Sequence, residues 1–596
     1  MKKKKSQSLL RTLLAFGGNY KYLTLIGMFL SGVSAIVSLF PIVFIWLSVK
    51  EIFSKYPSIV VTDSLIRYSW LTLGSTIGAM IIYFFALMCT HLAAFRIAKN
   101  MRVRAISHLM TLPLGYFNKE GSGKLRRIIS DSAAQTETYL AHQLPDLVGA
   151  LVTPLGVVIF LFLFDWRLGI VSLMPMALAT ISMMFIMGKG YSEQVAQYQT
   201  ELENVNNESV EYVRGIPVVK TFGQSIFSFR KFHDTIKAYQ KFVVNYTVHS
   251  RMPMVFFQTF MGSMALFLSI SGVWIIIGVS DPQNFLLNFL FYLFFTPICG
   301  MMMSKIMWTS QNTLLAEDAL SRVNELLSEK PLPQQPESKK VIKTFDITLN
   351  NVSYRYPNAR VNAVSDVSMS IKQGSKVALV GPSGGGKSTL AALIARFWDV
   401  TEGNISIGGV DVRNIDESEL MKNISFVFQH TNLYKASILD NLKEGKPNAT
   451  EEEVLEALKA ARCEDIIAKL PKGIHTVVNT KGVYLSGGEA QRIAIARAIL
   501  KDAPIILLDE ATAFADPENE YQIQLAFNEL TKGKTILIIA HRLPTIQNAD
   551  CIYLIENGSI KEMGTHDKLL SENGLYAEMW KEYQSAFIWN EREVLA

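Results

Sequence analysis

The sequence predicts a multi-domain membrane protein, with an N-terminal all-α domain of six transmembrane helices and a C-terminal α/β domain. Charged residues make up 18% of the 596 residues and hydrophobic residues 49%, whereas soluble domains carry about 25% charged residues. In the first half of the chain, the apolar residues gather in long runs almost free of charge. Beyond residue 345, short apolar runs alternate with polar helical stretches, as in layered α/β domains.

Six apolar runs have lengths near the roughly 20 residues that a helix needs to cross a bilayer. The third is short on its own (147–164) and is extended back to residue 140, and the tripeptide Asp165-Trp166-Arg167 is expected to form a tight external turn after it. The six predicted spans are 23–49, 68–95, 140–164, 168–188, 252–280 and 282–304.

The charge pattern predicts the orientation of these spans. Lys2–Lys5 and the segment from Arg96 to Arg104 are basic, and basic loops favour the cytoplasmic side. We interpret them as juxtamembrane anchors to the lipid bilayer, with no nucleic-acid partner, because they flank apolar runs. The first apolar run is too long for a cleaved signal sequence. The chain is therefore expected to be a multi-pass protein of the inner or plasma membrane, with both termini in the cytoplasm.

Two long polar segments, 96–146 and 189–251, separate the second span from the third and the fourth from the fifth. Both carry charged residues among apolar ones at helical spacing. We expect the spans to continue through them as long cytoplasmic helices. Pro331, Pro333 and Pro336 then interrupt helix formation and mark a linker. The predicted domains are residues 1–327 for the membrane part, 328–344 for the linker and 345–596 for the α/β part.

A phosphate-binding loop follows the buried apolar run Val377–Val380 and precedes a predicted helix. Its glycines allow backbone N–H groups to surround an anion, Lys387 supplies a positive charge, and Ser388 can hold Mg²⁺. The β- and γ-phosphates of a nucleotide would meet these groups at the start of the helix. The predicted nucleotide-binding residues of this loop are Gly381, Ser383, Gly384, Gly385, Gly386, Lys387, Ser388 and Thr389.

Three further motifs follow this loop in a fixed order. They are Leu485-Ser486-Gly487-Gly488-Glu489, the apolar run 505–508 ending in Asp509-Glu510, and His541 after the apolar run 535–540. A phosphate loop alone indicates only a nucleotide. The complete set resembles the ATP-binding cassette (ABC) transporter family over essentially the whole chain. With six spans and long inner extensions, the chain resembles half-transporters of the exporter-type (type IV) fold.

The resemblance implies a role in hydrolysis for four side chains. Asp509 would position Mg²⁺ through a water molecule, and Glu510 would act as the general base on the attacking water. His541 would contact the γ-phosphate, and Gln429, in Phe-Val-Phe-Gln, would reach both Mg²⁺ and the water. The implied catalytic residues are thus Glu510, His541 and Gln429, and the implied metal ligands are Ser388, Gln429 and Asp509.

The resemblance also implies how the nucleotide is held. Tyr356 would stack on adenine, with Tyr354 as the competing candidate. Ser486, Gly487 and Gly488 would bind the ATP held by another cassette, so the chain would need a second half-transporter. That partner would be a different homologous chain or a second copy of this one. In the family, the tips of the inner extensions rest on the ATPase domains. Here they are expected near 130–134 and 215–220.

Two stretches depart from the pattern of typical exporters. Asn479–Gly482 replaces a Gly-Glu-Gly-Gly-like stretch before the signature, and Ala513–Asp516 replaces a common Ser-Ala-Leu-Asp. The phrases 140–149 and 509–520 resemble half-transporters that import the siderophores yersiniabactin and mycobactin and that work as pairs of different chains.

The predicted function is therefore an ATP-driven transporter subunit for a small amphipathic or hydrophobic solute. Import of a siderophore or metal chelate is favoured, and export of lipids, drugs or peptides is the alternative. A non-transport ABC ATPase is a remote alternative, because such proteins usually lack spans. Recurrent methionines and the polar residues His91, Gln258, Asn288 and Lys305 are candidates for a cargo cavity, although helix packing explains the methionines equally well.

Overall fold

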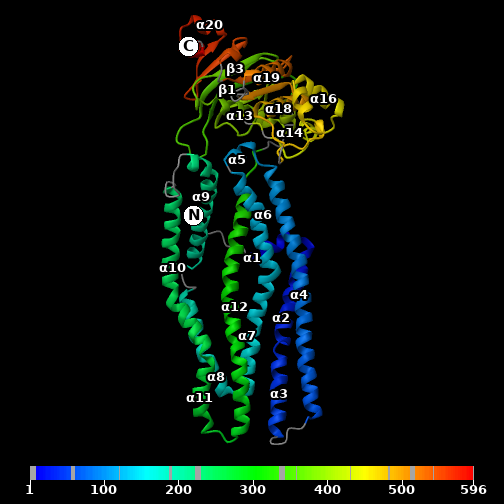
Figure 1. Ribbon diagram of the computed structural model, residues 1–596, viewed down its shortest axis with the longest axis vertical. Coiled ribbons are helices and arrows are strands. Elements are labelled where there is room, and N and C mark those ends of the chain that lie inside the picture. Colours follow the sequence, from blue (N-terminus) through cyan, green and yellow to red (C-terminus); the bar gives the residue numbers. More distant parts are fainter. Residues whose placement is uncertain are drawn as a thin grey trace. The chain divides into compact units, whose positions relative to one another are not determined.

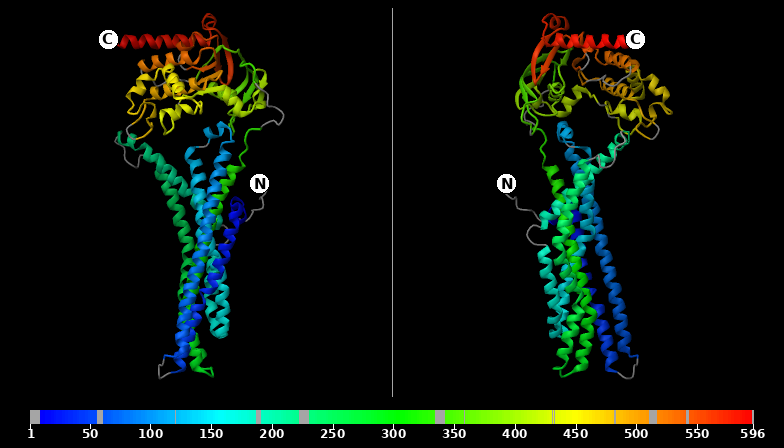
Figure 2. Two further views of the ribbon diagram at one scale, coloured as in Figure 1. Left: turned by 90° about the vertical axis from the view of Figure 1, so that its right-hand side faces the viewer. Right: turned by 60° about the vertical axis from the view of Figure 1, so that its left-hand side comes forward.

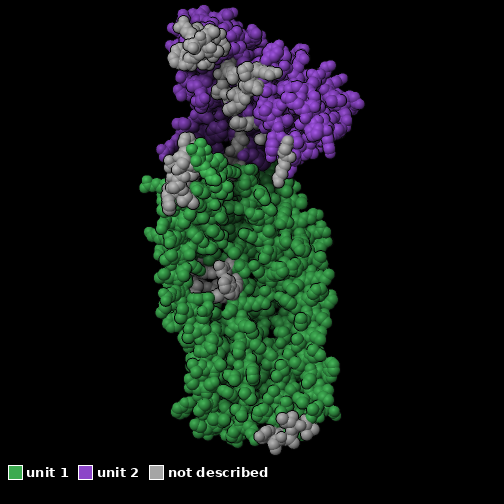
Figure 3. Space-filling view, viewed as in Figure 1, with its two compact units in different colours: residues 1–111, 120–329 green, residues 112–119, 330–596 purple. Residues whose placement is uncertain are grey.

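A computed structural model of the chain describes residues 9–594, except 56–60, 120, 187–190, 222–229, 334–341, 358, 430, 432, 481–482, 510–516 and 541–542. The chain divides into two compact units, coloured separately in Figure 3. Unit 1 comprises residues 1–111 and 120–329, and unit 2 comprises residues 112–119 and 330–596.

Unit 1 is helical throughout its regular elements (Figure 1). Its helices are α1 (Leu9–Phe16), the 3₁₀ turn η1 (Gly18–Tyr20), α2 (Lys21–Val37), α3 (Phe40–Ser54), α4 (Asp63–Leu109), α6 (Ser122–Thr138), the π-helical turn η2 (Tyr139–Gln143), α7 (Leu144–Phe164), α8 (Trp166–Ile186), α9 (Tyr191–Thr221), α10 (Arg230–Gly262), α11 (Met264–Ile276) and α12 (Pro282–Ser328).

Within the described residues of unit 1, five helical stretches are long and apolar enough to cross a membrane, and a bent pair supplies a sixth. The pair is α10 with α11, which bends by 48° at the break between Gly262 and Met264. The single stretches are Gly18–Ser54, Asp63–Leu109, Ser122–Phe164, Trp166–Phe185 and Pro282–Ile306. The predicted all-α membrane domain is thereby confirmed, and a count of six spans agrees with it.

Several spans differ from the expected uninterrupted rods. The first is divided between α2 and α3, where Pro41 occupies the first turn of α3. The external turn predicted over residues 165–167 is shorter, because Asp165 ends α7 and α8 begins at the next residue. The helices also run well beyond their apolar runs: α4 and α12 each have 47 residues. Figure 2 shows the α9–α10 pair diverging at one end from the other helices of unit 1.

The first predicted tip of an inner extension, 130–134, is wrong. Those residues lie inside α6, and Ser132 and Ala133 are buried there. Their small side chains allow close packing against neighbouring helices. The chain instead reverses between α4 and α6, near Pro113 and Gly121, both poor helix formers. The short helix α5 (Leu114–Lys119) in this reversal belongs to unit 2. The second expected tip, 215–220, falls at the end of α9, and residues 222–229 lie outside the described part.

Unit 2 is an α/β domain with two sheets, which confirms the predicted class of the C-terminal part. A four-stranded antiparallel sheet has the order β2-β1-β4-β5. A six-stranded sheet has the order β10-β9-β3-β8-β7-β6, parallel except for β10. The strands are β1 (Ile347–Tyr354), β2 (Val364–Ile371), β3 (Lys376–Val380), β4 (Glu402–Ile407), β5 (Val410–Asp411), β6 (Ile424–Val427), β7 (Ile505–Asp509), β8 (Thr535–Ile539), β9 (Cys551–Glu556) and β10 (Ser559–Gly564).

Helices cover the parallel sheet, and its strands read as continuous apolar runs because both faces are buried. The predicted runs before the phosphate loop and before Asp509 are indeed the strands β3 and β7. Besides α5 and short turns, the helices of unit 2 are α13 (Lys387–Ile394), α14 (Glu417–Asn423), α15 (Ile438–Lys443), α16 (Glu451–Ala460), α17 (Glu464–Lys469), α18 (Gly487–Lys501), α19 (Pro517–Leu530), α20 (His566–Ser571) and α21 (Leu575–Val594).

Candidate nucleotide site

The loop from Gly381 to Gly386 connects the buried strand β3 to the first turn of α13. Gly386 caps α13 with φ 102°, and Gly381 has φ 137°, both in the region that favours glycine. A Cβ on Gly386 would lie 2.4 Å from the carbonyl oxygen of Ala363, and one on Gly381 would lie 2.0 Å from that of Ile555. The backbone can therefore turn back over the start of α13 only with glycine at these two positions.

Lys387 directs its ammonium group into this loop. Its Nζ donates hydrogen bonds of 2.9 Å to the carbonyl oxygens of Gly381 and Pro382, and the residue is 4% exposed. Gly385 N–H donates to the Pro382 carbonyl over 3.1 Å, whereas Ser383 and Gly384 are exposed at the tip. A cation inside a ring of backbone groups at a helix N-terminus is suited to a polyphosphate.

Ser388, in the first turn of α13, contacts Asp509, the last residue of β7. The Ser388 hydroxyl donates to Oδ1 of Asp509 over 3.2 Å, although 121 residues separate them in the sequence. In the sheet, β8 lies between β7, which ends at Asp509, and β3, which leads into the phosphate loop. A hydroxyl and a carboxylate held together at the phosphate loop are hard oxygen ligands, the kind that Mg²⁺ prefers. The residues present therefore fit the metal that the sequence implies.

Gln429 lies two residues after β6, at the same sheet edge as Asp509, because β6 and β7 run parallel. It is partly buried. Glu510 and His541 lie outside the described residues. The strands that precede them are described: β7 ends at Asp509 and β8 ends at Ile539, side by side in the sheet. Where the general base and the histidine lie stays a prediction from the sequence.

The two tyrosines proposed for adenine differ in exposure. Tyr354 is 4% exposed in the core of unit 2, and burial raises the pKa of its hydroxyl. Tyr356 is partly exposed, and its hydroxyl lies 3.0 Å from Oγ1 of Thr389 in the first turn of α13. Its ring packs edge-on against Trp398 at 5.2 Å. Burial excludes Tyr354 as a stacking surface and leaves Tyr356 beside the phosphate loop.

The signature motif forms the N-terminus of α18. Ser486 is the N-cap residue: its Oγ accepts from the backbone N–H of Glu489 over 3.3 Å. The Glu489 carboxylate accepts in return from the Ser486 N–H over 2.8 Å. Gly487 is exposed in the first turn, and a Cβ on Gly488 would lie 3.1 Å from Asn519 of α19. The two glycines thus leave the first two positions of α18 without side chains.

Arg492 is a structural residue that the sequence reasoning missed. It is 2% exposed and bonds both carboxylate oxygens of Asp465, over 2.8 and 3.0 Å, and Oδ1 of Asn519 over 2.9 Å. Burial raises the pKa of Asp465, but the hydrogen bond and charge of Arg492 outweigh it and hold that pKa below its usual range. These residues line a cavity of about 650 Å³ beside Ser486. The available signal was an arginine directly before the largely apolar stretch 493–500.

The structure explains one residue of the unusual stretch before the signature, Asn479. Asn479 adopts φ 58°, in the left-handed region that asparagine tolerates better than most residues. Its side chain donates to the carbonyl oxygen of Leu433 over 2.7 Å, and its N–H donates to Val483. The asparagine side chain therefore ties the segment before the signature to the segment that follows Gln429. Lys481–Gly482 and Ala513–Asp516 lie outside the described residues.

Two family models match the chain. The model described as "ABC transporter" covers residues 364–513, and the model described as "ABC transporter transmembrane region" covers residues 24–298. The first match contains the phosphate loop, the signature and Asp509. The second overlaps every helical stretch that could cross a membrane, beginning within Gly18–Ser54 and ending within Pro282–Ile306.

Similar curated proteins differ in what their names say they move. The mycobactin import ATP-binding/permease protein IrtA of Mycolicibacterium smegmatis is 34% identical over 523 residues, which are 87% of this chain and 59% of that protein. The putative multidrug export ATP-binding/permease protein YgaD of Bacillus subtilis is 31% identical over 493 residues, 82% of this chain and 84% of that protein. The ATP-dependent lipid A-core flippase of Salmonella typhimurium is 31% identical over 504 residues, 83% and 84% respectively. The chain spans less than two thirds of the length of the mycobactin importers that it matches.

Proposed function

The chain belongs to the ABC transporter family, a family of ATP-hydrolysing translocases, and we propose that it is one half of an ATP-driven transporter for a small amphipathic or hydrophobic solute. The family match implies that unit 2 binds ATP. The observation that carries the proposal is the grouping of Lys387, Ser388 and Asp509 around one glycine loop, in a chain whose other unit has helices of membrane-spanning length.

Each residue of this group has a separate task in the proposed hydrolysis. Lys387 and the N-terminus of α13 attract the phosphates of ATP. Ser388 and Asp509 would hold Mg²⁺, which when bound neutralises charge on the transferred phosphoryl group. Glu510 would polarise the attacking water as a general base, with Gln429 orienting the water and His541 contacting the γ-phosphate. Tyr356 would hold the adenine ring by stacking.

We infer that Ser486 contacts the ATP held by a second cassette. Its oxygen already accepts the hydrogen bond from Glu489, so its O–H can donate to a phosphate presented from outside. The N–H groups of Gly487 and Gly488 and the dipole of α18 favour an anion at the same point. ATP held between two cassettes would favour the closed pair. Shifting such an equilibrium from mostly open to mostly closed needs about 5.5 kcal/mol of differential binding.

For the cargo, we favour import of a siderophore or metal chelate. The support is the similarity to proteins named as mycobactin importers, at 34 to 36% identity. Export of lipids or drugs is the second candidate. It is favoured by the lipid A-core flippase and the putative multidrug exporter, in which the match covers 84% of the relative's length.

The second half-transporter is either a different homologous chain or a second copy. The apolar helices make this chain a multi-pass membrane protein. We place it in the inner or plasma membrane with both termini in the cytoplasm, since the basic residues flanking the first two spans favour that side.

The experiment compares cells that express the chain with cells that lack it. Uptake of a radiolabelled lipophilic ferric chelate tests import, and accumulation of a fluorescent amphipathic dye tests export. A chain with Lys387→Ala at matched expression is the control, because it removes the cation of the phosphate loop. Import predicts greater chelate uptake with the intact chain alone, and export predicts less dye. Equal values for both probes in all three strains would contradict the proposed function.

A further inference from the structure

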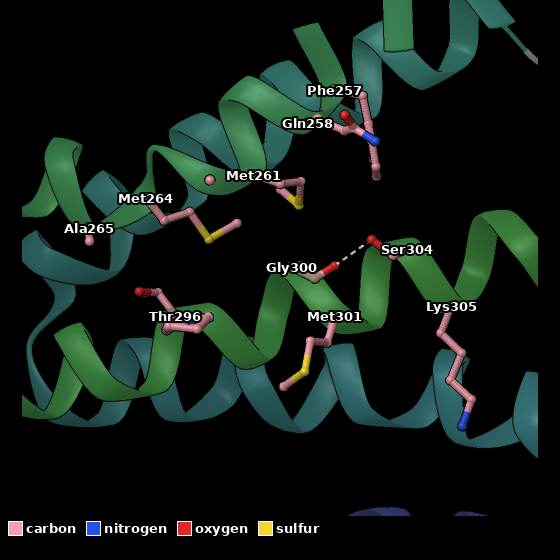
Figure 4. Close-up of a pocket in the computed structure, with 12 residues that line it drawn as sticks. Phe257, Gln258, Met261, Met264, Ala265, Thr296, Gly300, Met301, Ser304 and Lys305 are labelled. Carbon is pink, nitrogen blue, oxygen red and sulfur yellow. Dashed lines mark hydrogen bonds between the residues drawn. The ribbon is translucent and has the colours of Figure 1, made fainter. Parts of the chain in front are cut away.

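Unit 1 contains a cavity of about 670 Å³ between α10–α11 and α12 (Figure 4). This volume is within the range of about 300–1,000 Å³ that holds a drug-sized ligand. Phe257, Met261 and Met264 form part of its apolar lining, and Figure 4 shows both thioethers turned toward α12. Flexible methionines adapt to ligands of varied shape. The cavity therefore accepts a small, largely apolar body.

One lining residue lacks a hydrogen-bond partner. Thr296 is 0% exposed, and its Oγ1 makes no hydrogen bond within the part of the chain that the structure describes. Figure 4 shows this hydroxyl on α12 where that helix faces α11. A buried hydroxyl without a partner is unfavourable, and native proteins rarely keep one unless water or a ligand satisfies it. A polar atom of a ligand in the cavity would supply that partner.

At the other end of the cavity, the lining includes a positively charged residue, Lys305. Lys305 of α12 lines the cavity, and among the described lining residues it is the one with a charged side chain. Its Nζ lies 2.7 Å from Oδ1 of Asp146 on α7, and Tyr83 of α4 donates to the same oxygen over 2.7 Å. In Figure 4 the lysine extends away from α10. An ion pair within spans usually marks a functional site.

Both side chains of this ion pair are partly exposed. The Lys305 side chain is 47% exposed and that of Asp146 is 32% exposed. The four-carbon stem of lysine allows its ammonium to swing between partners. If Lys305 left it, Asp146 would keep the hydrogen bond from Tyr83 and would not be left without a partner. The arrangement thus permits a second acid to take the place of Asp146.

We propose that this cavity binds an amphipathic anion whose acidic group displaces Asp146 from Lys305. The apolar body would lie against Met261 and Met264, and a polar atom would bond Thr296. This inference rests on the proposed function, since it describes the class of cargo. It also links cargo to helix motion, because an occupied cavity loses the ion pair that joins α7 to α12.

The test uses the full-length chain, purified with its partner half, in nanodiscs of phosphatidylcholine, without nucleotide. The probes are 11-(dansylamino)undecanoic acid and its methyl ester, which differ only in the charge, and binding is followed by dansyl fluorescence. Wild type should bind the acid about tenfold or more tightly than the ester, the range of a hydrogen bond to a charged group. Asp146→Asn should strengthen acid binding several-fold, because it removes the competing carboxylate.

Lys305→Met should abolish the preference for the acid, and Lys305→Arg should keep it. Because Lys305→Met leaves Asp146 without its cation, the double variant Lys305→Met with Asp146→Asn is made as well. Its unchanged ester binding verifies folding, and it should show no preference for the acid. Equal binding of acid and ester by wild type, or a preference that persists in the double variant, would overturn the site.

Two further arms separate related explanations. Nanodiscs containing phosphatidylglycerol distinguish the source of the anion: weaker probe binding there identifies bilayer lipid as a competing occupant, and unchanged binding identifies a solute. Either result supports an anion site. ATP hydrolysis by wild-type discs without probe tests the transporter separately. Hydrolysis without a probe preference would refute the anion site alone, whereas a lysine-dependent preference without hydrolysis would refute the transporter alone.

Discussion

Ser486 and Glu489 cap each other at the start of α18, through hydrogen bonds of 3.3 Å and 2.8 Å. The same reciprocal pair stands at the start of α16, where Thr450 and Glu453 are joined by bonds of 3.3 Å and 2.9 Å. Only the first belongs to the motif that we propose contacts nucleotide. The two caps therefore allow the structural role of Ser486 to be separated from its proposed contact with ATP.

Ser486→Ala and Thr450→Ala should each destabilise the chain by about 1 kcal/mol, the usual cost of losing a hydroxyl N-cap. Thr450→Ala should keep the ATPase rate of wild type, whereas Ser486→Ala should lower it by about tenfold or more, as a lost hydrogen bond to a charged group would. Thermal unfolding and phosphate release measure the two effects. Equal ATPase rates in the two variants would contradict a direct role for Ser486.

Tyr356→Ala should weaken ATP binding roughly two- to tenfold, since an aromatic pair contributes about 0.5–1.5 kcal/mol beyond its buried area. Tyr356→Phe should bind almost as wild type, because it keeps the ring and loses only the hydroxyl beside Thr389. The measurement is the dissociation constant of ATP in the absence of magnesium. If the phenylalanine variant is as weak as the alanine variant, the hydroxyl matters and stacking does not.

Gly115 of α5 tests whether the packing of this helix against Phe397 and Trp398 is needed for transport. Its N–H donates to the carbonyl oxygen of Phe397 over 3.3 Å, and a Cβ there would lie 2.0 Å from the Trp398 ring. Gly115→Ala should therefore displace α5 and reduce cellular transport while ATP binding persists. Gly123→Ala is the matched control, because a Cβ at Gly123 meets nothing within 4 Å. If the two variants transport equally, the packing of α5 is not needed to couple ATP binding to transport.

The Asp465–Arg492 pair predicts a dependence of stability on pH. Because the pKa of Asp465 is lowered in the folded chain, the pair stabilises the fold above the unfolded value of about 3.9. This stabilisation is lost as the pH falls through the folded pKa. Between pH 6 and pH 3, the melting temperature of wild type should therefore fall more than that of Asp465→Asn. Glu464→Gln, which leaves the pair in place, should follow wild type, and a parallel fall in all three chains would contradict the assignment.

The parts of the fold that the sequence predicted are those set by local pattern. The apolar runs before Gly381 and Glu510 are buried parallel strands, and the helix begins at Lys387, because strand, glycine loop and helix follow one another directly. The expected tip at 130–134 failed because helical periodicity continues through α6 and does not indicate where the chain reverses. The bend between α10 and α11 was not predicted either, because no proline stands at the break.

The contacts within the site depend on residues far apart in the sequence. The bond between Ser388 and Asp509 follows from two motifs whose order was recognisable, so both residues were predicted. Arg492 and Asp465 lie 27 residues apart in separate helices, and no local pattern pairs them. The roles of Glu510 and His541 remain predictions of the motif order, because the structure does not describe these two residues.

The rate of ATP hydrolysis by the Glu510→Gln variant tests the central claim most directly. The chain would be purified with its partner half in nanodiscs, and phosphate release and bound ATP would be measured with and without magnesium. The proposed mechanism predicts magnesium-dependent hydrolysis in wild type and a rate lower by about 10²–10⁴-fold at the site of this chain in the variant, the usual contribution of a general base, with ATP still bound. An unchanged rate at that site, or hydrolysis indifferent to magnesium, would contradict it.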